Sequence, residues 1–262
     1  MQAKKSLGQN FLKCGWALTV IIKNANLNKE SVVLEIGPGT GLLTERLLET
    51  GASVIAVEKD DRLIPVLQHK FKDALANKTL TLIHGDILDI EIRKILPLPN
   101  IFSVIANIPY YITGQFIRIM LESEHQPQNM ILMLQKEVVK RIIATDKKES
   151  LLSLSIKAYG TARKVIDVPK ECFTPMPNVD SAVLQIEHIS KDYFKDFSET
   201  KFFETIRAGF GQKRKQLAGN LANHFNKKTE EIKLLLAQAQ IPENARAETL
   251  TLEQWANLIR LY

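Results

Sequence analysis

The most informative segment for the fold is Val32-Val33-Leu34-Glu35-Ile36-Gly37-Pro38-Gly39-Thr40-Gly41. Its first half is a short apolar run rich in β-branched residues, and residues 42–48 after it are apolar at helical spacing. Glycines between two such runs allow a tight turn and let a ligand lie against bare backbone. The stretch therefore predicts a strand, a glycine turn and a helix, with a ligand at the turn.

The spacing of these glycines narrows the class of ligand. A dinucleotide-binding turn follows the pattern G-x-G-x-x-G, in which the third glycine packs the helix onto the strand. Here Leu42 occupies the position of that third glycine. A G-x-G-x-G turn preceded by an acidic residue, Glu35, instead suits a ligand without a pyrophosphate. This spacing disfavours an NAD-dependent oxidoreductase.

Strands and helices alternate on both sides of this turn. Because alternating strands and helices form parallel sheets, the pattern predicts an α/β fold with a doubly wound sheet. Two late strands, joined by a proline-rich loop over 173–178, are expected to form an antiparallel edge. The expected strands span residues 32–36, 53–57, 79–83, 103–106, 130–134, 164–168 and 181–186.

The chain after residue 190 is helical in pattern to its end, which predicts a small C-terminal α-helical domain. We therefore expect two domains. Residues 1–189 form a ligand-binding catalytic domain with an N-terminal arm over about 1–30. Residues 190–262 form a helical domain that binds RNA or the ribosome.

Three polar residues follow successive expected strands. Glu58 ends the second strand, from which an acidic side chain binds ribose hydroxyls in doubly wound nucleotide binders. Asp86 follows the third strand, where its carboxylate is placed to accept a hydrogen bond from an adenine amino group. Asn107 ends the fourth. Because ligands of open α/β sheets bind beyond the carboxyl ends of the strands, these residues are expected to share one crevice.

Charge is concentrated at the two ends of the chain. The net charge is +6, with +4 over residues 1–30, −1 over 31–190 and +3 over 191–262. This distribution is typical of a protein whose ends bind a polyanion such as RNA. The two cysteines, Cys14 and Cys172, show neither metal-ligand spacing nor a disulfide framework, which favours a reducing interior. With no signal-like or membrane-spanning segment, we expect a cytoplasmic monomer without a metal.

Five motifs stand out along the chain, at residues 8–12, 35–41, 107–110, 173–181 and 210–217. Together they resemble the KsgA/RsmA family of ribosomal RNA adenine N6,N6-dimethyltransferases over essentially the whole chain. The resemblance implies a Rossmann-like class I methyltransferase domain, S-adenosyl-L-methionine as cofactor, and two adjacent target adenosines near the 3′ end of small-subunit (16S) rRNA. It also implies that the partner is an assembling 30S-type subunit.

The same resemblance assigns roles to individual residues. It implies that the N-terminal arm closes over the methionine end of the cofactor. The implied cofactor-binding residues are Asn10, Leu12, Gly37, Glu58, Asp86 and Asn107. The basic residues expected to contact RNA phosphates are Lys4, Lys5 and Lys13 in the arm, and Lys213, Arg214 and Lys215 on an expected C-terminal helix.

The residues Asn107 to Tyr111 fit the chemistry of methylating an adenine. The amino nitrogen of adenine is a poor nucleophile, because its lone pair is delocalised into the ring, and it must pyramidalise to attack. The side-chain oxygen of Asn107 and a main-chain carbonyl of the turn, held rigid by Pro109, are expected to stabilise the developing charge. Tyr110 is expected to stack on the target base, and Phe173 to close its other face. These three residues, Asn107, Tyr110 and Phe173, are the predicted catalytic set.

Two other functions remain open, and one segment of the sequence departs from the family pattern. A sister enzyme of the antibiotic-resistance type methylates an adenine of large-subunit (23S) rRNA, and it shares the glycine turn and the Asn-x-Pro-Tyr turn. A non-catalytic ribosome-assembly factor is the other alternative. Gly114 and Gln115 depart from the family pattern after the catalytic turn, and they are expected to loosen the start of the following helix.

Overall fold

The computed structural model describes residue 4 and residues 8–96, 101–144, 146, 148–212 and 214–261. The chain forms two compact units. The first unit comprises Met1–Val139 and Ala162–Ile189, and the second comprises Lys140–Thr161 and Ser190–Tyr262. The sequence places a single division after residue 189, whereas the structure also assigns residues 140–161 to the second unit. The reason is local packing: Tyr159 stacks on Phe203, and its hydroxyl donates a hydrogen bond to Glu199.

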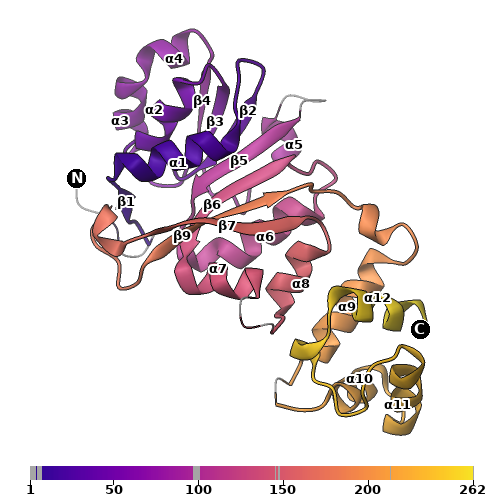
Figure 1. Cartoon of the computed structure of the whole chain (residues 1–262). Coiled ribbons are helices and arrows are strands. Elements are labelled where there is room, and N and C mark those ends of the chain that lie inside the picture. Colours follow the sequence, from indigo (N-terminus) through magenta and orange to yellow (C-terminus); the bar gives the residue numbers. More distant parts are fainter. Residues whose placement is uncertain are drawn as a thin grey trace. The chain divides into compact units, whose positions relative to one another are not determined.

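The first unit is built on a seven-stranded sheet of order β4-β3-β2-β5-β6-β9-β7 (Figure 1). The pairs β2–β3, β2–β5, β3–β4 and β5–β6 are parallel, and β9 is antiparallel to β6. The expectation of a mostly parallel sheet with an antiparallel strand near one edge is confirmed. The strands are β2 (Val32–Ile36), β3 (Ser53–Glu58), β4 (Leu80–His84), β5 (Phe102–Asn107), β6 (Asn129–Gln135), β7 (Thr161–Val168) and β9 (Ser181–Glu187).

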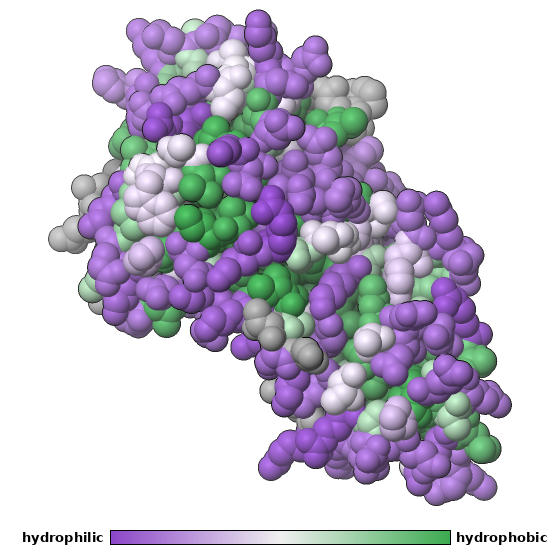
Figure 2. Space-filling view, in the orientation of Figure 1, coloured by the Kyte–Doolittle hydropathy of each residue, from purple (hydrophilic) through white to green (hydrophobic). Residues whose placement is uncertain are grey.

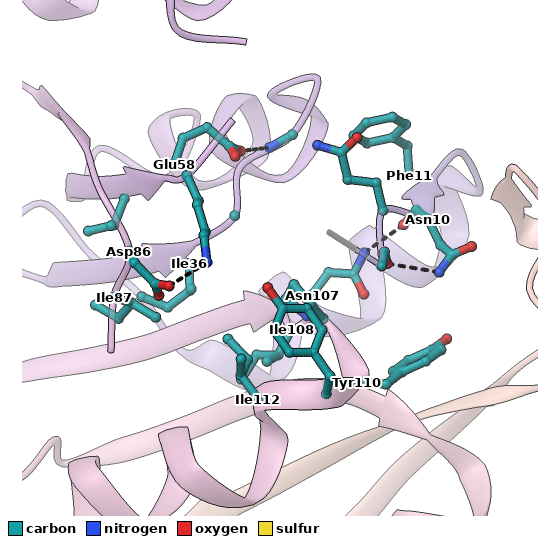
Figure 3. A pocket seen from close by; sticks show the side chains of 18 of the residues that line it. Asn10, Phe11, Ile36, Glu58, Asp86, Ile87, Asn107, Ile108, Tyr110 and Ile112 are labelled. Atoms are coloured by element: carbon teal, nitrogen blue, oxygen red, sulfur yellow. Dashed lines mark hydrogen bonds and ion pairs between the residues drawn. The ribbon is translucent and has the colours of Figure 1, made fainter. Parts of the chain in front are cut away.

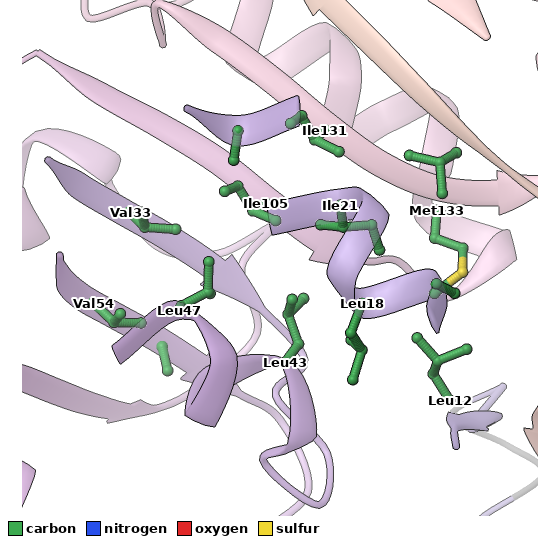
Figure 4. Packing of buried hydrophobic residues seen from close by; sticks show 14 of the residues in the cluster. Leu12, Leu18, Ile21, Val33, Leu43, Leu47, Val54, Ile105, Ile131 and Met133 are labelled. Atoms are coloured by element: carbon green, nitrogen blue, oxygen red, sulfur yellow. The ribbon is translucent and has the colours of Figure 1, made fainter. Parts of the chain in front are cut away.

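Helices bury both faces of the central strands. Every residue of β2 is buried, which is typical of a parallel strand covered on both sides. On one face, side chains of α1 and α2 pack against alternate residues of β2, β3 and β5, such as Val33 and Ile105 (Figure 4). The helices that begin in this unit are α1 (Gly15–Ala25), α2 (Leu42–Leu48), α3 (Ile64–Lys70), α4 (Lys72–Ala76), α5 (Ile92–Ile95), α6 (Thr113–Glu122) and α7 (Lys136–Ile143).

The N-terminal arm is fixed to the proline-rich loop. Strand β1 (Phe11–Leu12) pairs antiparallel with β8 (Phe173–Thr174), and the Lys13 amide donates to the Cys172 carbonyl over 2.8 Å. Directly beside this pair, Cys14 and Cys172 form a disulfide with a Cα–Cα distance of 5.1 Å. The expectation that the two cysteines do not pair is therefore wrong. Their separation of 158 residues carries no local signal of the contact.

The second unit is helical, as the sequence predicts. Its core holds Trp255 and Phe202, both fully buried. Gly209 permits this packing, since a Cβ there would lie 2.4 Å from the indole ring of Trp255. The helices are α8 (Leu151–Lys157), α9 (Glu199–Gly209), α10 (Leu217–Phe225), α11 (Thr229–Gln238) and α12 (Leu252–Arg260).

Polar side chains predominate on the face seen in Figure 2, where hydrophobic residues form small, separate groups. Within the described part of the chain, no helix is both long and apolar enough to cross a membrane.

Candidate functional site

The three glycines of the turn after β2 all adopt a backbone conformation that favours glycine. Gly37, Gly39 and Gly41 have φ values of 64°, 59° and 78°, in the left-handed region. A Cβ on Gly39 would lie 2.9 Å from the ring of Phe11, and one on Gly41 would lie 2.5 Å from the ring of Phe71. By contrast, a Cβ on Gly37 would meet no atom within 4 Å. The turn is therefore tightly packed on its protein side, while its backbone at Gly37 borders open space.

That space is a cavity at the carboxyl ends of the strands (Figure 3). The ends of β2, β3 and β5, the turn after β4 and the N-terminal arm all contribute to its wall. It brings together five of the predicted cofactor residues, and Leu12 lines a smaller cavity that shares the glycine turn and Asn107 with it. The five residues that meet in the larger cavity are Asn10, Gly37, Glu58, Asp86 and Asn107.

Glu58 at the end of β3 is tied to the glycine turn. Its carboxylate accepts hydrogen bonds from the backbone N–H groups of Gly39 (3.1 Å) and Asp60 (2.8 Å). Burial raises the pKa of Glu58 above its usual range, against the lowering effect of these two donors. The carboxylate is thus held rigidly beside the turn, with lone pairs left for ligand hydroxyl groups.

Asp86 is paired with a lysine that the sequence analysis did not single out. The Lys59 ammonium donates to the Asp86 carboxylate over 2.5 Å, and the Leu88 amide donates to its other oxygen. Partial burial raises the pKa of Asp86, but the lysine and the amide outweigh it and hold the pKa below its usual range. Asp86 therefore remains an ionised hydrogen-bond acceptor at neutral pH, as its predicted role requires.

Asn107 at the end of β5 has a defined orientation. Its side-chain nitrogen donates to the Asn10 carbonyl over 3.1 Å, and the Asn10 side chain donates in turn to the Gly8 carbonyl. No described residue donates a hydrogen bond to the side-chain oxygen of Asn107, which leaves this oxygen available to a ligand N–H. The arm therefore fixes the amide so that it presents an acceptor, as the sequence analysis expects.

Tyr110 and Phe173 do not form an open two-sided slot in this structure. The Tyr110 hydroxyl hydrogen-bonds the Ser181 hydroxyl over 2.9 Å, and its half-buried ring lines the cavity. Phe173, by contrast, is only 2% exposed, and it packs in the hydrophobic core because β8 pairs with β1 and lies against Leu12. The expected clamp on the base is therefore absent among the described residues: Phe173 is a core side chain here.

Glu35 is a second residue whose role the sequence left unassigned. It lines the smaller cavity, it is 1% exposed, and its Oε2 has no hydrogen-bond partner within the described part of the chain. Burial raises the pKa of Glu35 to about 8. The sequence signal for a role of Glu35 is its position directly before the glycine turn. The burial of β2 on both sides, which raises the pKa of Glu35, is visible only in the structure.

The predicted RNA-binding residues lie in both units, and two are outside the described residues, Lys5 and Lys213. Lys4 and Lys13 are exposed, and the Lys4 ammonium lies 3.7 Å from Asp60. Arg214 and Lys215 are exposed as well. They lie in the loop between α9 and α10 and not on the expected helix, because α9 ends at Gly209 and α10 begins at Leu217.

The expected loosening after the catalytic turn is not observed. A 3₁₀ turn over Tyr110–Ile112 continues directly into α6, which begins at Thr113. Gly114 and Gln115 are exposed residues of its first turn. The helix therefore begins directly after the 3₁₀ turn in spite of these two residues.

The polar side chains of the cavity fit a nucleoside that carries positive charge. Hydrogen-bond acceptors predominate among them: Glu58 and Asp86 at the strand ends, and the free oxygen of Asn107 between them and the arm. Apolar walls from Ile87 and Ile108 suit a flat base. Among the described residues, no cluster of three His, Cys, Asp or Glu side chains is placed to hold a metal ion.

Comparison with known proteins identifies close sequence relatives. The family model described as ribosomal RNA adenine dimethylase matches residues 1–262. A ribosomal RNA small subunit methyltransferase A of Dehalococcoides mccartyi is 40% identical over 262 residues, which cover 100% of this chain and 89% of that protein. The protein of the same name from Fusobacterium nucleatum is 37% identical and covers 99% of this chain and 97% of its own.

Two solved structures share the fold. A dimethyladenosine transferase from Plasmodium falciparum superposes with a TM-score of 0.78 at 24% identity, covering 95% of each chain. The 23S rRNA methyltransferase ErmE superposes with a TM-score of 0.75 at 24% identity, covering 96% of this chain and 99% of its own. At this level of identity, both similarities concern the fold alone.

Proposed function

Because the chain belongs to the ribosomal RNA adenine dimethylase family, we propose that it dimethylates adenine amino groups of small-subunit ribosomal RNA with S-adenosylmethionine as cofactor. The observation that carries this proposal is the position of Asn107. Its free acceptor oxygen lies at a strand end, in the same cavity as the acidic residues Glu58 and Asp86. One cavity thus provides acceptors for a nucleoside cofactor and for the amino group of a target base.

The cofactor would be held by the residues that line the two cavities. Glu58 would accept hydrogen bonds from the ribose hydroxyls, and Asp86 from the adenine amino group. Gly37 would let the cofactor lie against the backbone, while Asn10 and Leu12 of the arm would contact its methionine end. When bound, S-adenosylmethionine supplies an electrophilic methyl group.

The residues of the turn after β5 would position and activate the target adenine. The Asn107 oxygen would accept a hydrogen bond from the amino group and stabilise the positive charge that develops as its nitrogen pyramidalises. Pro109 offers no N–H that competes for this interaction. Tyr110, anchored through Ser181, would stack on the base and hold it in line for transfer. Phe173 would act only indirectly, through its packing in the core beside Leu12 of the arm.

The finer substrate assignment is part of the proposal. Two adjacent adenosines near the 3′ end of small-subunit rRNA, presented within an assembling subunit, are the proposed targets. Lys4, Lys5 and Lys13 in the arm, with Lys213, Arg214 and Lys215 in the second unit, would contact RNA phosphates. We propose that the enzyme acts as a monomer in the cytoplasm, where ribosomal subunits are assembled.

The large-subunit alternative is not favoured. The relatives at about 40% identity carry a small-subunit name, whereas the 23S rRNA methyltransferase ErmE shares the fold at 24% identity. Primer extension on rRNA from cells with and without the gene separates the two. A modification lost from large-subunit RNA alone would exclude the proposed substrate.

The proposed mechanism is tested by Asn107→Ala. We expect methyl transfer to under-methylated small subunits to fall by roughly 100-fold or more, as for the loss of one transition-state hydrogen bond. Binding of the RNA is expected to stay within about threefold of the wild type, because other residues contact the phosphates. The matched control is Asn24→Ala, an asparagine of α1 that does not line the cavity. Wild-type transfer by Asn107→Ala would contradict the assignment.

A further inference from the structure

Two consecutive tyrosines follow Pro109, and only one of them has a role in the proposed mechanism. Residues 110–112 form a 3₁₀ turn, in which successive side chains point about 120° apart. The structure shows three corresponding environments. Tyr110 is hydrogen-bonded to Ser181, Ile112 is buried in the core, and Tyr111 is 59% exposed. Tyr111 is therefore directed away from the fold.

Although exposed, Tyr111 lies at a defined place on the rim of the cavity. It lines the same cavity as Asn107 and Tyr110. On one side its ring borders the N-terminal arm, since a Cβ on Gly8 would lie 3.5 Å from the ring. Lys59, directly after β3, lines the same cavity, and the pKa of its ammonium is raised chiefly by the hydrogen bond to Asp86, with a smaller contribution from the phenol group of Tyr111. Tyr111 thus lies beside the arm, on a cavity wall that it shares with Lys59.

The fold gives no reason for an aromatic residue at this position. No described residue forms a hydrogen bond with the Tyr111 hydroxyl, and its outer surface is in contact with solvent. A single exposed aromatic ring is ordinary on a protein surface, so what distinguishes Tyr111 is its place on the wall of the cavity. The ring shares the cavity with a cation, Lys59, whose side chain is 47% exposed and whose ammonium is paired with Asp86. A flat, exposed ring next to a positive charge is the combination that binds single-stranded nucleic acid.

We propose that Tyr111 is a stacking platform for the nucleobase next to the target adenine in the RNA chain. This inference rests on the proposed function, because it takes the target base to enter at Asn107. When that base is inside, the neighbouring nucleotide must lie at the rim, where it meets Tyr111. The ring binds the face of any base, and the Lys59 ammonium attracts the adjoining phosphate. Tyr111 is accordingly a substrate-positioning residue and not part of the methyl-transfer machinery.

The test measures stacking directly. An RNA hairpin with an unpaired adenosine carries 2-aminopurine next to that adenosine, on its 5′ side in one probe and on its 3′ side in another. Stacking on an aromatic side chain quenches 2-aminopurine fluorescence. With the wild-type protein we expect quenching in one of the two probes. Tyr111→Ala is expected to abolish that quenching and to weaken RNA binding about tenfold.

Two controls separate stacking from other roles of Tyr111. Tyr111→Phe keeps the ring and loses the hydroxyl, so it is expected to quench like the wild type. The affinity of Tyr111→Ala for S-adenosylmethionine is expected to stay within twofold of the wild type, because Tyr111 is 59% exposed and is not one of the residues proposed to hold the cofactor. A loss of cofactor affinity with unchanged quenching would overturn the inference, and it would assign Tyr111 to the cofactor site.

Methyl transfer to the hairpin or to under-methylated small subunits is measured in the same preparations. Equal quenching by wild type and Tyr111→Ala overturns the stacking inference, whether or not methyl groups are transferred. Quenching that depends on Tyr111, with no transfer by the wild type to either RNA, would contradict the proposed function and leave the stacking assignment in place. The two failures are therefore distinguishable.

Discussion

Replacement of the buried acid Glu35 by glutamine should change how the stability of the protein depends on pH. Burial raises the pKa of Glu35 from 4.5 to about 8. In the unfolded chain this carboxyl ionises near its ordinary pKa. Between these two values the folded protein binds one more proton than the unfolded chain does. The contribution of Glu35 to stability is therefore fully present below pH 4.5 and is lost as the pH rises through this window.

The magnitude follows from the width of the window. Each unit of pKa difference corresponds to about 1.4 kcal/mol, so a shift from 4.5 to about 8 sets a ceiling of about 5 kcal/mol. From pH 5 to pH 8 the free energy of unfolding of the wild type should fall by about 3–4 kcal/mol relative to Glu35→Gln. Glutamine has nearly the same shape and carries no proton that titrates, so this term is absent in the variant.

The assay is urea denaturation followed by circular dichroism at pH 5, 6, 7 and 8. The unfolding midpoints of wild type and Glu35→Gln should diverge as the pH rises, with the variant becoming relatively more stable. Glu30→Gln serves as the control, since Glu30 is an exposed carboxylate just before β2. Parallel pH profiles for wild type and Glu35→Gln would refute the reasoning, because they would mean that Glu35 titrates alike in both states.

The remaining predictions concern the covalent link and the glycine turn. Cys14→Ser removes a disulfide to Cys172 that spans 158 residues, and loop-closure entropy limits the stabilisation lost to about 5 kcal/mol. Without reductant, we expect a lower unfolding midpoint for the variant than for the wild type. Equal midpoints would argue against the disulfide. Gly41→Ala places a Cβ 2.5 Å from the Phe71 ring at a φ of 78° and should destabilise by about 1–3 kcal/mol in thermal unfolding. Gly114→Ala is its control, because nothing lies within 4 Å of the added atom, and similar losses in both variants would contradict the packing argument.

Local sequence patterns were sufficient to predict the sheet and the strand-end residues. The apolar runs that form β2 to β6 each lie between recognisable turns, and the carboxyl ends of parallel strands meet at one edge. The residues Glu58, Asp86 and Asn107 could therefore be placed together before the structure was known. In the structure all three line one cavity.

Contacts between distant segments were not predictable in the same way. The pairing of β1 with β8 and the disulfide of Cys14 join residues far apart in sequence, and neither leaves a periodic pattern. This pairing also explains why Phe173 is buried, although its motif suggested an exposed ring. The Lys59–Asp86 pair likewise depends on the parallel register of β3 and β4. Such contacts depend on tertiary structure, which local periodicity does not encode.

The central claim is tested most directly by locating the methyl groups that the protein transfers. Under-methylated small subunits are incubated with the protein and labelled S-adenosylmethionine, and the RNA is digested and analysed by mass spectrometry. We expect N6,N6-dimethyladenosine at two adjacent positions near the 3′ end of small-subunit rRNA. Label confined to large-subunit RNA, or no labelled adenosine at all, would contradict it.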